Sequence, residues 1–362
     1  MLSLTRRSLL LLGVLSGAPL LCGCTHEDRP AEAERKKADA DLPLRARAVA
    51  DTDRLLAGYD AVLAGPGAAQ GDRLRALRAE VAEHRAALST GLPSAAAPPT
   101  ASAPASSAAS APASSAASAP ASSVAALAAA ERTTAGARLA DLAAASPELA
   151  KLLAAVSASG ALHAAALGDS GPVTGPAAAA PSPSPSPSPS PSVSAPASAS
   201  GSASASAPVT PRAAAETAAL QSTLAAEHAA VYGYGVVGAR QPVGPQRSEA
   251  QVCYLAHQAE RDTWQRLLHS AGATPAAAAP GYQLPFPVTD AATAKQLAAH
   301  IEVQLTGVYA ALVAAGSGEL RQSAATALRE SALRARQWGA DQAALPGLPA
   351  ADGATANPSP SA

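Results

Sequence analysis

The stretch Leu224-Ala-Ala-Glu-His-Ala-Ala-Val-Tyr-Gly-Tyr-Gly235 places an acid and an imidazole inside a run that otherwise has the pattern of a buried helix. At about 100° per residue, Glu227 falls in the centre of the apolar stripe, whereas His228 points about 100° away, so the pair is not a chelate. An isolated buried carboxylate is costly, so we expect Glu227 to meet a metal, a cation or a shared proton. The stripe consists of Leu220, Leu224, Glu227, Val231 and Tyr234.

The same four-three spacing recurs in two later segments. One contains Cys253, His257, Glu260, Trp264 and Leu267, and the other contains Ala298, Glu302, Leu305, Tyr309 and Leu312. Three predicted helices therefore direct a carboxylate towards a shared interior.

Helical periodicity predicts an all-α protein with two tandem ferritin-like four-helix bundles. The C-terminal domain, residues 211–346, has short, long and short connections between its helices, as in a ferritin-like bundle with one crossover. The N-terminal bundle, residues 41–168, has the same order of connections, with a low-complexity insert at 93–123 in the crossover position. The predicted helices span residues 41–63, 71–88, 124–145, 147–167, 211–239, 247–270, 290–315 and 318–343.

The two halves also align without gaps over short segments. Residues 75–88 match 255–268 and pair Glu80 with Glu260, while Glu131 pairs with Glu302. In the last helices, 161–164 matches 332–335. These matches favour an internal duplication, and chance similarity between Ala-rich helices is the alternative.

Ferritin-like two-metal sites need a Glu from each of two helices and Glu-x-x-His from each of the others, because two cations require bridging carboxylates and imidazoles. This chain departs from that pattern. Thr263 follows Glu260 by three residues, and Leu333 follows Glu330, while His257 precedes Glu260.

Three interpretations of this constellation stay open. We expect no cofactor, with His257, Arg334 and the carboxylates forming ion pairs that fix the register of a bundle without metals; Arg334, four residues after Glu330, is predicted to form a buried ion pair with it. A two-metal site for Fe, Mn or Zn would use Glu227, His257, Glu260 and Glu302. A single ion or another polar ligand is the third interpretation.

Three chemistry-bearing residues of the N-terminal half, His84, Glu131 and His163, fall on apolar stripes. They could hold Zn or Fe(II) if the helices brought them together. The alternative, which we favour, is that the two histidines are hydrogen-bonded core residues.

The first residues have the pattern of an export signal. Arg6 and Arg7 precede an apolar run from Leu9 to Leu21, about 13 residues long, which is too short to span a bilayer. The end of this run resembles a bacterial lipobox with Cys24 as the lipidated residue, so residues 1–23 are expected to be a signal peptide. A plain secretory signal cleaved near Gly23 is the alternative. Arg6 and Arg7 also match twin-arginine export, and a general secretory signal explains them equally.

The remaining segments are predicted to be linkers. Residues 24–40 are charged and lack apolar periodicity, which predicts a tether. A Pro/Ser-rich linker at 169–210 contains six consecutive Pro-Ser pairs, which favour polyproline II, and a disordered tail is expected at 347–362. The net charge of -1 and the lack of a basic stripe with interleaved aromatic residues argue against a nucleic-acid partner. Once the signal is removed and Cys24 is lipidated, Cys253 is left as the free thiol.

Three motifs resemble an actinobacterial family of ferritin-like domains without an assigned function. They are residues 224–235, the crossover Leu284-Pro-Phe-Pro-Val-Thr-Asp290 and Leu333-Arg-Ala-Arg-Gln-Trp338. The resemblance covers about residues 213–346 and implies a four-helix fold but no activity.

We therefore expect a lipid-anchored protein on the extracytoplasmic face of the cell membrane. Its expected function is a non-catalytic binding or scaffolding module with an envelope protein as possible partner. The alternative is a metal-binding oxidoreductase or metal store that uses the inward-facing carboxylates.

Overall fold

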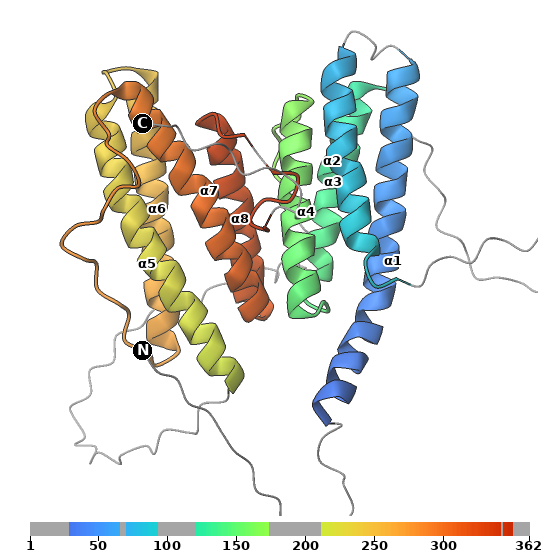
Figure 1. The fold of residues 1–362 in the computed structure, drawn as a ribbon, viewed down its shortest axis with the longest axis horizontal. Helices are drawn as coiled ribbons and strands as arrows, with labels where there is room; N and C mark the ends of the chain where they lie inside the picture. Colours follow the sequence, from blue (N-terminus) through green and yellow to red (C-terminus); the bar gives the residue numbers. More distant parts are fainter. Residues whose placement is uncertain (1–28, 66–69, 93–120, 174–210, 342, 350–362) are drawn as a thin grey trace, which may run out of the picture. The chain divides into compact units, whose positions relative to one another are not determined.

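The computed structural model describes residues 29–65, 70–92, 121–173, 211–341 and 343–349; side chains are described from residue 36 in the first range and from residue 213 in the fourth. Within these ranges the chain is all-α, as predicted, with eight helices and no strand (Figure 1). The helices are α1 (Arg29–Ala64), α2 (Gly71–Ser89), α3 (Val124–Asp141), α4 (Pro147–Ala166), α5 (Pro211–Arg240), α6 (Pro245–Ser270), α7 (Ala291–Ala315) and α8 (Gly318–Gln337).

The helices α5 to α8 form one four-helix unit around a shared interior. Residues 241–244 join α5 to α6, a long segment at 271–290 leads to α7, and residues 316–317 join α7 to α8. This is the short, long, short order predicted from the sequence. A capping box begins α7, because the Asp290 side chain accepts from the Thr293 backbone N–H while the Thr293 hydroxyl accepts from that of Asp290.

The end of α8 differs from the prediction. The helix ends at Gln337 rather than near residue 343. Gly339 has φ +88°, in the left-handed region that glycine adopts without strain, and Ala340 N–H donates back to the Ala335 carbonyl. The glycine therefore terminates the helix before the periodic apolar pattern runs out.

Cross-helix contacts also join α1, α2, α3 and α4. The Arg85 and Arg78 guanidinium groups of α2 pair with Asp53 and Asp60 of α1. Between α3 and α4, the Ser157 hydroxyl donates to the Ala135 carbonyl. Ser146 caps α4 by accepting from Leu149 N–H, and Pro147 occupies the first turn, as expected from the sequence.

The predicted start of the first helix at residue 41 is wrong, because α1 begins at Arg29, within the segment predicted to be a tether. Residues 29–40 are rich in Ala, Glu, Lys and Arg, which favour helix without needing a buried face. Apolar periodicity alone therefore misses this part of the helix. The chain divides into two compact units between Asp39 and Ala40, and the packing described here concerns residues from Ala40 onwards.

The contacts of α4 extend to α8 and α7, which explains its unusually apolar sequence. Every residue from Leu153 to Ala164 is buried. Two arginines of α8 donate to backbone carbonyls in and just before α4: Arg321 to Leu142 and Ala145, and Arg336 to Leu162. Helix α4 therefore buries side chains all around its circumference rather than along one stripe.

Two helices, Pro147–Ala166 and Ala291–Ala315, are long and apolar enough to cross a membrane. In the structure, 83% and 50% of their most apolar windows are buried within the protein. Core helices pass the same test, so these two helices give only weak evidence for a membrane span.

Two predicted boundaries differ from the structure. The linker was expected from residue 169, but Val173 is buried and its carbonyl accepts from Arg329. The tail was expected from residue 347, but Gly347 lies against the Thr306 backbone with φ +80°, where a Cβ atom would clash. The predicted signal peptide with Arg6, Arg7 and Cys24 lies outside the described residues, as do residues 93–120 of the predicted insert, 174–210 of the predicted linker and 350–362 of the predicted tail.

Candidate functional site: a buried charge network

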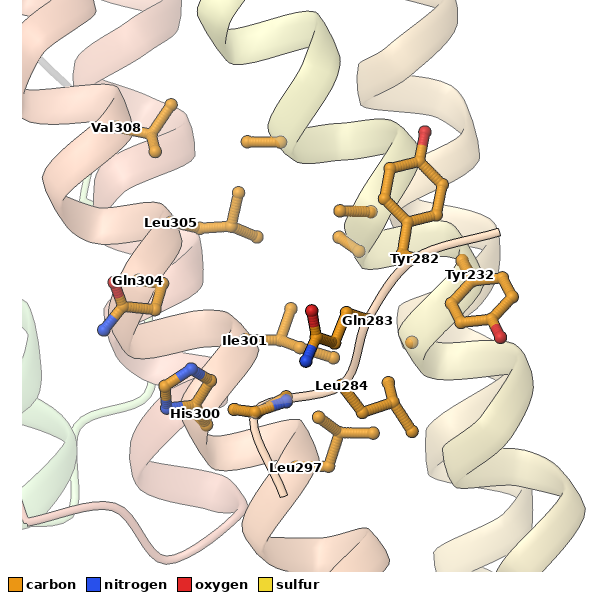
Figure 2. A pocket seen from close by; sticks show the side chains of 15 residues that line it. Tyr232, Tyr282, Gln283, Leu284, Leu297, His300, Ile301, Gln304, Leu305 and Val308 are labelled. Carbon is orange, nitrogen blue, oxygen red and sulfur yellow. The ribbon is translucent and has the colours of Figure 1, made fainter. Parts of the chain in front are cut away.

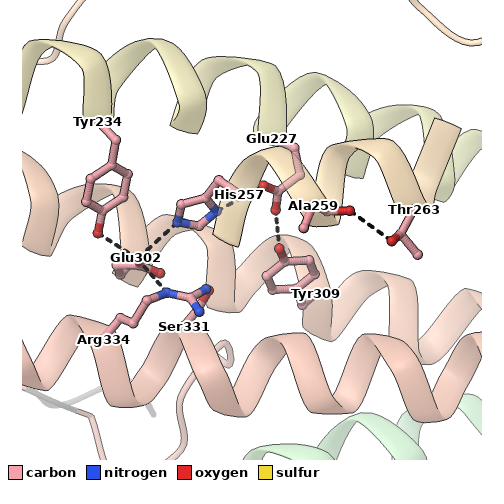
Figure 3. A network of polar contacts seen from close by, with 9 residues as sticks. All are labelled: Glu227, Tyr234, His257, Ala259, Thr263, Glu302, Tyr309, Ser331 and Arg334. Carbon is pink, nitrogen blue, oxygen red and sulfur yellow. Dashed lines mark hydrogen bonds and ion pairs between the residues drawn. The ribbon is translucent and has the colours of Figure 1, made fainter. Parts of the chain in front are cut away.

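The interior of α5 to α8 contains a network of charged side chains to which each helix contributes one residue (Figure 3). His257 of α6 lies between two carboxylates. Its Nδ1 is 3.0 Å from Glu227 Oε2 on α5, and its Nε2 is 3.1 Å from Glu302 Oε1 on α7. All three side chains are fully buried. Because both ring nitrogens face carboxylates, the geometry fits the doubly protonated imidazolium.

The fourth helix supplies Arg334, whose Nε donates to Glu302 Oε1 at 2.8 Å. The predicted ion pair between Glu330 and Arg334 is therefore wrong. Glu330 instead pairs with its neighbour Arg329 at 3.1 Å, near the surface. The helical spacing allows the predicted pair, but Arg334 extends inwards because the fully buried Glu302 needs a cation more than the half-exposed Glu330 does.

Two tyrosines complete the network with hydrogen bonds. The Tyr234 hydroxyl donates to Glu302 Oε1 at 2.6 Å, and the Tyr309 hydroxyl donates to Glu227 Oε1. Figure 3 shows both phenols reaching the carboxylates from the two flanks of His257. Among the described residues, Glu302 Oε2 is a buried atom without a hydrogen-bond partner.

The pKa values agree with a network of fixed charges. Burial alone would lower the pKa of His257, but the hydrogen bonds and charges of Glu227 and Glu302 outweigh it and raise that pKa to about 9. For Glu302, burial would raise the pKa, but the His257 hydrogen bond and the Arg334 charge hold it below its ordinary value. The pKa of Arg334 is raised, because Glu302 outweighs the effect of burial. His257 and Arg334 are thus both cationic at neutral pH, and both lie against the ionised carboxylate of Glu302.

Glu260, the remaining predicted metal ligand, is half-buried on α6. Burial raises the pKa of its carboxyl, and the Glu227 charge raises it further. Three residues later, where a two-metal site needs histidine, Thr263 donates its hydroxyl to the Ala259 carbonyl of its own helix (Figure 3). This hydroxyl satisfies the helix backbone rather than an ion.

The four predicted ligands do not form a metal centre in this arrangement. Within the described ranges, no group of three or more His, Cys, Asp or Glu side chains is placed to hold an ion. The imidazole of His257 fills the space between Glu227 and Glu302, and both of its nitrogens are engaged. A metal would have to displace the imidazole and compete with the Arg334 guanidinium for Glu302.

A second buried network lies among α1 to α4. His163 of α4 places Nδ1 3.1 Å from Glu131 and Nε2 3.0 Å from Glu80. The Tyr59 hydroxyl donates to Glu131 at 2.8 Å. Burial would lower the pKa of His163, but Glu131 and Glu80 raise it to about 9. The predicted Zn or Fe(II) candidates are close together, but again as an ion pair.

His84, the other predicted candidate, makes a different set of contacts. Its ring stacks on that of His163 with centroids 5.6 Å apart, and Nε2 is 2.7 Å from the Ala344 carbonyl. A carbonyl only accepts, so Nε2 carries the proton. Burial, reinforced by the His163 and Arg138 charges, lowers the pKa of His84 to about 3. His84 is thus a neutral core histidine, the favoured interpretation of the sequence.

The two networks use matching positions. In the sequence alignment Glu131 corresponds to Glu302, and His163 corresponds to Arg334. In the structure, His163 contacts Glu131 just as Arg334 contacts Glu302. Tyr59 and Tyr234, each preceded by a glycine, donate to these two glutamates. A further contact also recurs. Thr52 and Glu227 each lie seven residues before the tyrosine, and Arg138 and Tyr309 each lie seven residues after the glutamate; Arg138 donates to Thr52, and Tyr309 donates to Glu227.

Sequence patterns predicted the buried carboxylates but missed the tyrosines as their donors, although Tyr59, Tyr234 and Tyr309 are apolar-stripe residues that the structure buries.

A groove lies beside the charge network of α5 to α8, between α5 and α7, under residues 282–285 of the crossover (Figure 2). Its volume is about 200 Å³. Small residues of α5 form one wall, and Leu297, Ile301 and Leu305 of α7 form another. Neither the groove nor its lining was predicted from the sequence, because a surface recess depends on how two helices and a loop pack.

Comparisons with known proteins agree with a domain without an assigned activity. Residues 219–350 match the family model described as "Domain of unknown function (DUF4439)". No curated protein matches the chain. A solved structure of a conserved hypothetical protein, rv2844, from Mycobacterium tuberculosis is 40% identical, covers 34% of this chain and 95% of its own, and has a TM-score of 0.34. Residues 219–350, which contain the whole charge network of α5 to α8, therefore carry a DUF4439 domain, a domain of unknown function.

Proposed function

We propose that the protein is a non-catalytic binding module of the cell envelope, built from ferritin-like bundles and held to the membrane through a lipid on Cys24. The lipobox-like residues before Cys24 and the apolar run after Arg6 and Arg7 support the localisation. A diacylated cysteine with an added N-acyl chain exceeds the two signals that stable membrane attachment requires. The partner in this proposal is another envelope component rather than a nucleic acid.

The mutual neutralisation of the buried charges carries the non-catalytic part of the proposal. Glu227, His257, Glu302 and Arg334 satisfy one another in the centre of the domain. Catalytic carboxylates and metal ligands need an open position for a substrate or an ion, whereas the polar atoms of these side chains, apart from Glu302 Oε2, are engaged by one another and by the two tyrosines. The network instead fixes the four helices in one register, a role attested for buried polar groups in some helical assemblies.

One observation favours the alternative, a metal-binding oxidoreductase or metal store. Three carboxylates, Glu227, Glu260 and Glu302, belong to the same bundle, and Glu302 Oε2 is a buried acceptor without a partner among the described residues. Fe, Mn or Zn would need His257 and Arg334 to move away from these carboxylates.

Metal analysis of the full chain tests the proposal. The protein is produced with iron, manganese or zinc in the medium, purified, and analysed for bound metal and melting temperature. We expect well under one equivalent of metal per chain and an unchanged melting temperature, because a ligand that binds only the native state must raise it. Two tightly held ions per chain that are lost in Glu227→Gln would overturn the non-catalytic assignment.

A further inference from the structure

The groove between α5 and α7 exists because one face of α5 has only alanine and glycine residues. Ala226, Ala229, Ala230 and Gly233 recur at three- and four-residue steps along this face and line the groove. A Cβ atom on Gly233 would lie 2.5 Å from Ile301 Cδ1, so a larger residue here would push the end of the Ile301 side chain aside. The recess is thus built by small residues on one helix and branched or long apolar residues on the other.

A second groove occurs at the matching place in the N-terminal half, between α1 and α3, with a volume of about 410 Å³. The same differences in residue number that align the two charge networks also align the residues that line the two grooves. On α1 the lining residues Asp51, Arg54, Leu55, Ala57 and Gly58 correspond to Ala226, Ala229, Ala230, Tyr232 and Gly233 of α5. On α3 the lining residues Ala126, Ala129, Ala130, Thr133 and Thr134 correspond to Leu297, His300, Ile301, Gln304 and Leu305 of α7. A cavity that recurs at the same register in both halves is a feature of the repeated unit, not of one packing accident.

The two grooves differ in charge. Asp51 and Arg54 line the α1–α3 groove and pair with each other at 2.8 Å. The α5–α7 groove has no Asp, Glu, Lys or Arg among the described residues that line it. Its polar groups are neutral and belong to Tyr232, Tyr282, Gln283, His300 and Gln304; burial lowers the pKa of His300, which keeps that ring uncharged at neutral pH.

Figure 2 shows Gln283 reaching towards the groove from the crossover, while Tyr232 and Tyr282 lie together at one edge. Their ring centroids are 5.5 Å apart. At the opposite edge, Gln304 and His300 extend from α7. The volume of about 200 Å³ is below the roughly 300–1,000 Å³ of pockets for drug-sized ligands. The groove therefore suits a slender apolar chain with a neutral polar end, rather than a cofactor ring or an anion.

We propose that the α5–α7 groove binds the alkyl chain of a neutral single-chain amphiphile, with its polar end at the Tyr, Gln and His side chains of the rim. This inference rests on the proposed function, since it names the ligand class of the binding module. An uncharged head matches a rim that offers hydrogen bonds but no ion pair. The apolar walls of Leu297, Ile301 and Leu305 bury the chain, so each methylene of the ligand that leaves water strengthens binding.

Calorimetric titration with monodecanoylglycerol, below the concentration at which it forms micelles, tests this assignment. The full chain carries Cys24→Ala, so that no acyl chain of its own competes. We expect saturable binding with about one ligand per chain. Decanoate at pH 8 should bind at least about tenfold more weakly, because its carboxylate would meet no cation in the groove.

A filled groove provides the decisive variant. Ala229→Leu should weaken monodecanoylglycerol binding about tenfold or more, and the milder Ala229→Val should give an intermediate loss. Ala218→Leu, on an exposed turn of the same helix away from the groove, is the matched control and should bind as the parent does. Melting temperatures of all three variants establish that they fold.

Three results would overturn the assignment: no binding to the parent, equal binding by Ala229→Leu and Ala218→Leu, or tighter binding of decanoate than of the neutral ligand. A Pro-rich peptide that binds in place of the amphiphile and is blocked by Ala229→Leu would assign the groove to peptides instead. These outcomes do not depend on metal content. Failure of the groove assignment is therefore distinguishable from failure of the non-catalytic assignment.

Discussion

The two halves of this protein share a framework of contacts but differ in the chemistry placed on it. Tyr59 donates to Glu131 in the first half as Tyr234 donates to Glu302 in the second. Around this shared pair, the cation on the last helix is His163 in one half and Arg334 in the other. The helix positions that face the interior are fixed by the bundle, whereas the residues there are exchangeable as long as each buried carboxylate meets a cation.

The difference is largest at the pair that connects the first and third helices. Thr52 accepts from the Arg138 guanidinium in the first half, and Glu227 accepts from the Tyr309 hydroxyl in the second. The first half therefore pairs a cation, Arg138, with a neutral acceptor, whereas the second half pairs an anion, Glu227, with a neutral donor. The added anion at Glu227 is balanced by His257, where the first half has Leu77. The two halves therefore reach a balanced interior by different combinations of residues.

Substitution of the shared glutamate should have the largest effect in both halves. Glu302→Gln leaves His257 and Arg334 facing one carboxylate fewer, and Glu131→Gln does the same to His163 and Arg138. We expect each change to lower the free energy of unfolding by about 3–5 kcal/mol, measured by urea denaturation. Glu330→Gln, which removes a half-exposed partner of Arg329, is the control and should cost at most about 0.5 kcal/mol. Wild-type stability in Glu302→Gln would contradict the ion-pair interpretation.

Substitution at the differing pair should have a smaller and unequal effect. Glu227→Gln keeps an acceptor for the Tyr309 hydroxyl but removes the charge that faces His257, so we expect a loss of about 1–3 kcal/mol. Thr52→Val removes one neutral acceptor of Arg138 and should cost about 1 kcal/mol. Urea denaturation of the two variants side by side measures the difference. A greater loss in Thr52→Val would break the proposed correspondence between the two networks.

Acidification should act on the first half through His84, since the corresponding position of the second half is Trp264, which has no charge to gain. The folded-state pKa of His84 is about 3, below the unfolded value of 6.5, so the unfolded chain binds a proton that the folded chain excludes. Stability should therefore fall as the pH drops below 6.5, by about 1 kcal/mol at pH 5.5. In His84→Gln this contribution should vanish from the pH dependence of unfolding. An unchanged acid slope in that variant would show that His84 does not titrate as described.

Helix positions and inward faces were predictable because they follow from local periodicity. The stripes that contain Glu227, Glu302 and His257 correctly identified these residues as buried. The extent of α1 was underestimated because its first turns have helix-favouring residues without an apolar face. The ion-pair partners were harder to predict. Arg334 can reach either Glu330 on its own helix or Glu302 on the neighbouring one, but the sequence gives only the spacing between Arg334 and Glu330.

The sequence by itself determined that this protein is helical and that carboxylates and histidines face its interior, and it favoured a repeat of one pattern in the two halves. Those properties depend on residues three to seven apart, which a helix places at fixed angles. Only the tertiary structure decided that the His257 imidazole occupies the space between Glu227 and Glu302, that Arg334 completes the charge balance, and that small residues of α5 leave a groove against α7. These outcomes depend on side chains that meet across helices far apart in the chain, where burial cost rather than sequence distance selects the partner.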